Sequence, residues 1–134
     1  MARGGWIYVG SRMKSFVPPA EKLQIMRTCE AFIADTIKPR AIPKKVPTDR
    51  NYPIDVVGKW LANRYRIILR MKTTGANATV PEFDWPIARI GYVNKDLFDL
   101  DFYRHTGEWI TLHQRITLAE ALESIATEPF FQLY

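Results

Sequence analysis

A chain of 134 residues with a formal net charge of +5 has the length of one ordinary domain and can bury its own core. Its apolar content of 47% and charged content of 25% are typical of a globular protein, and no apolar run is long enough to span a membrane. The first residues lack the apolar stretch of a signal peptide. The single cysteine, Cys29, excludes an internal disulfide framework and favours a reducing compartment, so we expect a cytoplasmic location.

The positive charge is concentrated in the first part of the chain. Residues 1–50 contain ten Lys or Arg and four Asp or Glu, whereas residues 51–134 contain nine and ten. Such asymmetry is one mark of nucleic-acid binding, but no basic run is long and no nucleic-acid-binding motif accompanies it. We therefore interpret the excess as a solvated helix face and a lysine-bearing linker.

Residues 1–15 are interpreted as an N-terminal extension, disordered or a short strand, and residues 16–134 as a single domain. A first helix is predicted from the Pro18-Pro19 pair, because proline suits the first helical turn. It carries one apolar stripe with three- and four-residue spacing, made of Ile25, Met26, Cys29, Phe32, Ile33, Thr36 and Ile37. Lys38-Pro39 is predicted to end this helix, and the prolines up to Pro53 favour an extended crossing segment.

The hydrophobic period then changes to two. Residues 64–72 are predicted to form a half-buried strand whose outer face is basic, with apolar residues at alternate positions. A shorter strand is expected at 54–57, a loop at 73–85, and three further strands in 86–94, 97–104 and 108–114. A second helix is predicted to begin at Thr117 with a capping box to Glu120 and to end before Pro129, followed by an apolar tail.

Loop length fixes which side chains face each other across a hairpin. Three-residue loops at 94–96 and 105–107, the second with Gly107 in the left-handed position, separate apolar from polar pairs. The predicted core pairs are Tyr92–Phe98, Ile90–Leu100, Ala88–Phe102, Phe102–Ile110 and Leu100–Leu112. The predicted outer rows are Ile87–Tyr103–Trp109, Arg89–Asp101–Thr111 and Gly91–Asp99–His113.

This register predicts the candidate site residues. His113 beside Asp99 would form a pair of the kind that acts as a general base, but no serine or cysteine is placed to be a nucleophile. The other predicted site is a binding surface on the outer face, made of Arg64, Arg66, Arg70, Arg89, Tyr103 and Trp109. The cysteine and histidines do not match a zinc-ligand spacing, so we predict no metal site, and nothing indicates a cofactor.

The order of these patterns resembles a family of small bacterial domains of unknown function. In that family a strand of the type "PIARIGYVN" leads to a hairpin with a Trp-centred strand, "EWITL", and then a Leu-rich helix, "TLAEALESIATEP". The resemblance covers about residues 16–134 and is carried by Ala88, Tyr92, Tyr103 and Trp109. Where the family often has a glycine-bearing motif after the last helix, this chain has "PFFQLY". The resemblance implies no established activity and no catalytic residue.

The sequence therefore predicts an α+β fold: an antiparallel meander of four to five strands, with an N-terminal and a C-terminal helix on one face. Two functional classes remain open. The first is a non-enzymatic binding or accessory domain that contacts a protein partner, forms a homodimer or, weakly, binds nucleic acid through strand 64–72. The second is a small enzyme that uses Asp99 and His113, for which a third convergent group cannot be named.

Overall fold

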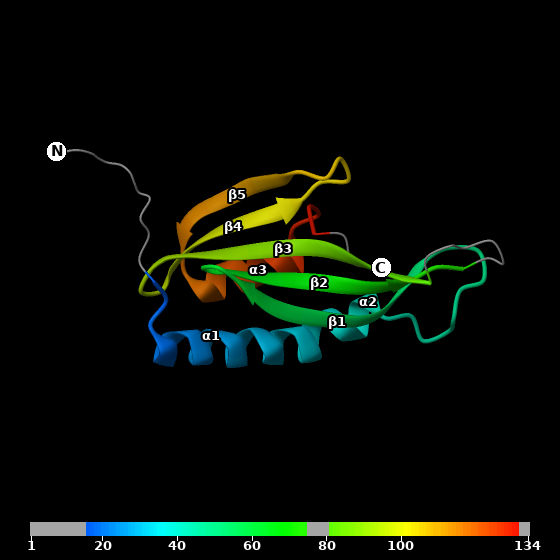
Figure 1. The fold of residues 1–134 in the computed structure, drawn as a ribbon, viewed down its shortest axis with the longest axis horizontal. Helices are drawn as coiled ribbons and strands as arrows, with labels where there is room; N and C mark the ends of the chain where they lie inside the picture. Colours follow the sequence, from blue (N-terminus) through cyan, green and yellow to red (C-terminus); the bar gives the residue numbers. More distant parts are fainter. Residues whose placement is uncertain (1–15, 75–80, 132–134) are drawn as a thin grey trace.

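The computed structural model describes residues 16–74 and 81–131 (Figure 1). The predicted extension at 1–15, part of the predicted loop at 73–85 and the end of the tail lie outside the described residues. The helical elements are α1 (Pro19–Phe32), the π-helical turn η1 (Ile33–Ile37), α2 (Lys38–Ala41) and α3 (Leu118–Thr127). The strands are β1 (Tyr52–Leu61), β2 (Arg64–Lys72), β3 (Glu82–Asn94), β4 (Leu97–Tyr103) and β5 (Trp109–Ile116).

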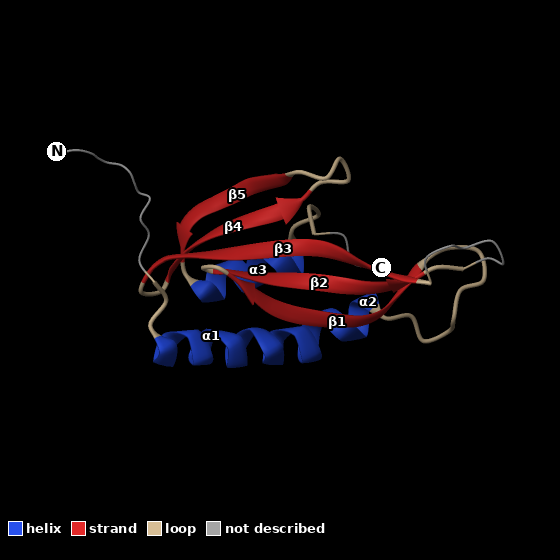
Figure 2. Ribbon diagram, in the orientation of Figure 1, coloured by secondary structure: helices blue, strands red, loops and turns tan. Residues whose placement is uncertain are grey.

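The five strands form one antiparallel sheet in the order β1-β2-β3-β4-β5, so each strand pairs with its neighbours in the sequence. The two long helices pack on one face of this sheet, and Figure 2 shows no helix in front of the other face. The predicted α+β meander with a helix at each end is therefore confirmed. None of the helices in the described ranges is long and apolar enough to cross a membrane.

One core joins the helices to the covered face of the sheet. Helices α1 and α3 contribute alternate turns of their apolar stripes, and β2, β3 and β4 contribute every second residue. The side chains of Ile67, Leu69 and Leu100 are fully buried, as the two-residue period requires. Gly58 on β1 makes room for this core, because a Cβ built there would lie 1.7 Å from the hydroxyl oxygen of Tyr65.

The first helix does not end at Lys38-Pro39, so that prediction was wrong. The chain instead widens into η1, in which the backbone N–H of Lys38 donates to the carbonyl of Ile33, and then continues as α2. Pro39 thereby occupies the first turn of a new helix, where its missing N–H breaks no hydrogen bond. The stripe of α1 and η1 stays buried at Ile25, Cys29, Ile33 and Ile37.

Two strands are longer than predicted. β1 spans 52–61 rather than 54–57, and β3 begins at Glu82, inside the segment predicted as a loop. The β3–β4 pairs follow the prediction, with Ala88 opposite Phe102 and Arg89 opposite Asp101. The predicted three-residue loop at 94–96 was wrong, because Asn94 pairs with Leu97 and an irregularity between Tyr92 and Asn94 takes up the extra residue. The hairpin between β4 and β5 turns as predicted, with Gly107 at a φ of +91°.

The β4–β5 register agrees with the prediction for three pairs and then departs from it. Tyr103 lies opposite Trp109, Phe102 opposite Ile110 and Asp101 opposite Thr111, as expected. Leu100, however, lies opposite His113 rather than Leu112, because β5 contains a bulge at this point. A second irregularity near Arg115, whose φ is +56°, brings Ile116 opposite Phe98.

Candidate functional site

The open face of the sheet carries a row of charges on β1 to β4, which ends at Thr111 of β5. The Cα register joins Lys59 of β1 to Arg66 of β2, Arg66 to Arg89 of β3, Arg89 to Asp101 of β4, and Asp101 to Thr111 of β5. Neighbouring strands lie about 4.8 Å apart, so three cations stand at successive steps before the first carboxylate.

A single ion pair lies at the centre of this row. Arg89 Nε donates to Asp101 Oδ2 at 2.7 Å, with side-chain exposures of 16% and 7%. The indole of Trp109 shields the pair, since its ring centroid lies 4.5 Å from Arg89 Cζ. Water cannot screen the charges fully here, and the pair holds both side chains in one geometry.

Arg66 stands beside this pair and has no carboxylate partner among the described residues. Its Cζ lies 5.5 Å from the Trp109 centroid, and its buried Nε has no hydrogen-bond partner within residues 16–74 and 81–131. Partial burial, followed by the neighbouring charges of Arg89 and Arg64, lowers the pKa of Arg66. The shift reports mainly the lost hydration of the guanidinium and, to a smaller extent, the nearby like charges.

Two further cations border Arg66. Lys59 lies next to it on β1, and the side chain of Arg64 crosses Gly91, where a Cβ would lie 3.8 Å from Arg64 Nε. Among the described residues, Lys59, Arg64 and Arg66 form no ion pair. We call the surface made of Lys59, Arg64, Arg66, Arg89, Tyr103 and Trp109 the arginine–tryptophan face.

The aromatic side chains of this face form an edge-to-face series. The rings of Tyr103 and Trp109 are 5.0 Å apart, and those of Trp85 and Tyr103 are 5.5 Å apart. Trp109 is therefore occupied by an aromatic neighbour and two guanidinium groups. It acts as a cover for the charges rather than as a free platform for stacking.

Most of the residues predicted for the binding surface come together. Arg64, Arg66, Arg89, Tyr103 and Trp109 lie on or beside the same row, but Arg70 does not join them.

Two carboxylates neutralise Arg70. Its Nε lies 2.8 Å from Asp84 and its terminal nitrogen 3.5 Å from Glu82. Lys59 was not among the predicted site residues, although the strand alternation of β1 would have placed it on this face.

The predicted contact between Asp99 and His113 was wrong. Asp99 Oδ1 instead accepts a hydrogen bond from the backbone N–H of Arg115 at 3.1 Å. The bulge in β5 turns His113 to the helical side of the sheet. His105, the second histidine, is exposed in the β4–β5 loop, as expected.

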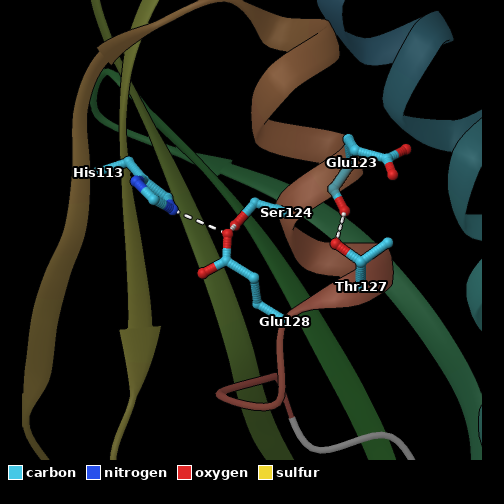
Figure 3. Close-up of polar contacts among 5 residues, drawn as sticks. All are labelled: His113, Glu123, Ser124, Thr127 and Glu128. Carbon is cyan, nitrogen blue, oxygen red and sulfur yellow. Dashed lines mark hydrogen bonds and ion pairs between the residues drawn. The ribbon is translucent and has the colours of Figure 1, made fainter.

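His113 forms a different cluster, shown in Figure 3. Its Nε2–H donates to Glu128 Oε2 at 2.8 Å, and the hydroxyl of Ser124 donates to the same oxygen. These two hydrogen bonds, that from Ser124 first, lower the pKa of Glu128. The serine proton points to the carboxylate and not to the imidazole, so this geometry does not activate Ser124 as a nucleophile.

Neither Ser124 nor Glu128 was predicted as a partner of His113. Their i, i+4 spacing places them on one side of the α3 terminus, but the bulge that brings His113 to them leaves no mark in the sequence. In the described ranges 16–74 and 81–131, no group of three His, Cys, Asp or Glu side chains could hold a metal ion. Burial raises the pKa of the Cys29 thiol to about 12.

The fold and its open, charged sheet face define a small α+β domain of helix, five-stranded meander and helix. Residues 17–132 match the family model described as a domain of unknown function (DUF3024), so the chain belongs to this family. Comparisons with curated proteins and with solved structures found no match.

Proposed function

We propose that the protein is a non-enzymatic binding domain whose arginine–tryptophan face binds an acidic surface of a protein partner. The observation that carries this proposal is the group of Lys59, Arg64 and Arg66, which is unpaired among the described residues on the open face. A carboxylate placed against them would supply the counter-charge and the hydrogen bond that the partly desolvated guanidinium of Arg66 lacks among the described residues.

The fixed geometry of the face supports binding by its arginines. Arg89 is held by Asp101, and Trp109 lies over Arg66 and Arg89, so less side-chain freedom is lost when a partner is bound. Arginine also binds carboxylates in a bidentate manner, and with tryptophan and tyrosine it dominates the energetics of protein interfaces.

Charge favours an acidic partner over a second copy of the chain. A two-fold dimer through this face would set the same patch against itself, cations included, at a cost in repulsion. Nucleic acid is disfavoured for a different reason. The ring of Trp109 is occupied, and Asp99 and Asp101 lie on the β4 positions next to Gly91 and Arg89.

The test uses two polyanions of different chemistry, poly-L-glutamate and a random-sequence DNA duplex. We expect the ¹H–¹⁵N resonances of the face to shift with poly-L-glutamate, and the affinity to fall as salt rises. The variant Arg64→Gln/Arg66→Gln should bind at least about fivefold more weakly. Arg27→Gln, an exposed arginine of α1, is the matched control and should bind like the wild type.

Two results would overturn the proposal. One is poly-L-glutamate binding that is unchanged in Arg64→Gln/Arg66→Gln, since the unpaired arginines would then not be the site. The other is tighter, sequence-selective binding of DNA at physiological salt, which would assign the face to nucleic acid. The small-enzyme alternative required a contact between Asp99 and His113, whereas His113 binds Glu128 and Asp99 accepts a hydrogen bond from Arg115.

A further inference from the structure

A separate cavity of about 450 Å³ lies at the end of β4, between β3 and the segment that follows α3. Its volume is within the range of small-molecule sites in proteins. The cavity is lined by nine residues, of which seven are apolar or aromatic and two, Arg104 and His105, are basic. None of the lining residues is acidic.

One wall is a pair of phenyl rings. Phe130 packs on Phe102 with ring centroids 4.9 Å apart and an angle of 37°. Phe130 is 46% exposed, whereas its neighbour Phe131 is 5% exposed and anchors the segment in the core. Phe131 thus holds Phe130 at the surface, where its exposed ring can form the wall of an apolar site.

Trp85 and Tyr103, whose rings meet edge to face at 85°, form a second aromatic pair in the lining. Rings with this mutual support stay in place when the cavity is empty, so the site is preformed for a flat apolar body. Pro86 and Pro129, which restrict the backbone on each side, also line the cavity.

The cluster of His113, Ser124 and Glu128 holds the first wall in place. Glu128 directly precedes Pro129 and is bound from β5 by His113 and from α3 by Ser124 (Figure 3). The carboxylate thereby fixes the point at which the chain leaves α3 and turns toward Phe130. His113 is in this arrangement a positioning residue for the cavity.

We infer that this cavity binds a small planar aromatic molecule that carries one carboxylate. The aromatic body would lie against these two aromatic pairs, and the carboxylate would face Arg104, whose side chain forms no ion pair with the described residues. The cavity shares Tyr103 with the arginine–tryptophan face, but it has its own arginine, Arg104, and does not include Arg64 or Arg66.

The test compares two probes of the same shape, naphthalene-2-acetate and its uncharged counterpart naphthalene-2-acetamide. By ¹H–¹⁵N NMR titration the acetate should bind saturably with a Kd on the order of 0.1–1 mM, as expected of a fragment. The acetamide should bind about five- to tenfold more weakly at low salt. Contacts between the naphthyl protons and Phe102 and Tyr103 should appear as intermolecular NOEs.

Variants separate the two parts of the inference. Arg104→Met should remove the difference between acetate and acetamide, while Arg27→Met, on the far helix, should keep it. Phe130→Ala should weaken both probes at least tenfold. Because Phe130 is exposed, this variant should keep its thermal midpoint close to the wild type; if it unfolds, the NOEs of the wild type decide the location.

Three outcomes would refute the inference. The first is the absence of saturable binding of naphthalene-2-acetate. The second is equal affinity for acetate and acetamide in the wild type, which would exclude recognition of the carboxylate by Arg104. The third is a set of shifts and NOEs confined to residues of the arginine–tryptophan face other than Tyr103, which would leave the cavity without a ligand.

Discussion

The ion pair between Arg89 and Asp101 permits a quantitative test of how the open face is held. Both side chains are largely buried, and Trp109 covers the arginine. Removing one partner of a buried pair costs about 3–5 kcal/mol, because the other charge stays behind uncompensated. We expect Arg89→Met to lower the free energy of unfolding by about 3 kcal/mol, since it leaves the carboxylate of Asp101 without a donor.

Together with Arg89→Met, the variant Asp101→Asn and the double variant form a double-mutant cycle. The variant Asp101→Asn should lose less stability than Arg89→Met. Asp101→Asn leaves an arginine that is 16% exposed and still stacked on Trp109, so we expect a loss of about 2 kcal/mol. The double variant leaves neither charge unpaired and should lose about 3 kcal/mol rather than 5, a coupling energy of about 2 kcal/mol.

Urea denaturation of the four proteins measures this coupling, provided that the m-value stays constant. The coupling energy should change little between 0.1 M and 1 M NaCl, because a shielded ion pair is poorly accessible to water and salt. Losses that add within about 0.5 kcal/mol would mean that the charges do not interact as described. The open face would then lack the rigidity on which the proposed binding function relies.

Three further predictions concern the core and the cluster at Glu128. Tyr65→Phe should leave the free energy of unfolding unchanged or raise it by up to about 1 kcal/mol, as measured by urea denaturation, because the buried hydroxyl has no hydrogen-bond partner among the described residues; a loss above about 1 kcal/mol would contradict this. Cys29 should resist a thiol-reactive dye in the native protein and react after unfolding, because its pKa of about 12 leaves almost no thiolate; rapid native labelling would show that the thiol is accessible. Glu128 has a folded pKa below its ordinary value of 4.5, so it contributes stability above that value, which is lost as the pH falls through the folded pKa. Denaturation of the wild type and Glu128→Gln from pH 7 to about 3 should show their difference shrinking as the solution becomes acidic, and a constant difference would refute the linkage.

The fold could be predicted from the sequence because local patterns and loop lengths agree with each other. The period of two in residues 64–72 identified β2, and the three-residue loops placed Arg89 opposite Asp101 and Tyr103 opposite Trp109. Most of the arginine–tryptophan face was predicted from these pairs and from the alternation of residues 64–72, but Lys59 was not predicted and Arg70, which was, pairs with Asp84 and Glu82.

The partner of His113 could not be predicted, because the facing of this side chain depends on one extra residue inside a strand. The alternation of β5 reads as regular from Trp109 to His113, and a bulge changes the facing of one side chain without a change in composition. The continuation of the first helix past Pro39 was missed for a similar reason. A π-helical turn inserts one residue and moves the proline to a permitted position, which a fixed period of 3.6 residues does not anticipate.

The irregular pairing of β5 also limits the addition of another strand at this edge of the sheet. A strand at the edge of a sheet has unpaired backbone N–H and C=O groups that can pair with another chain. A regular edge strand therefore favours aggregation. After Thr111 the backbone of β5 is displaced twice, and Arg115 holds a left-handed φ and gives its N–H to Asp99. A foreign strand could follow this edge for only a few residues.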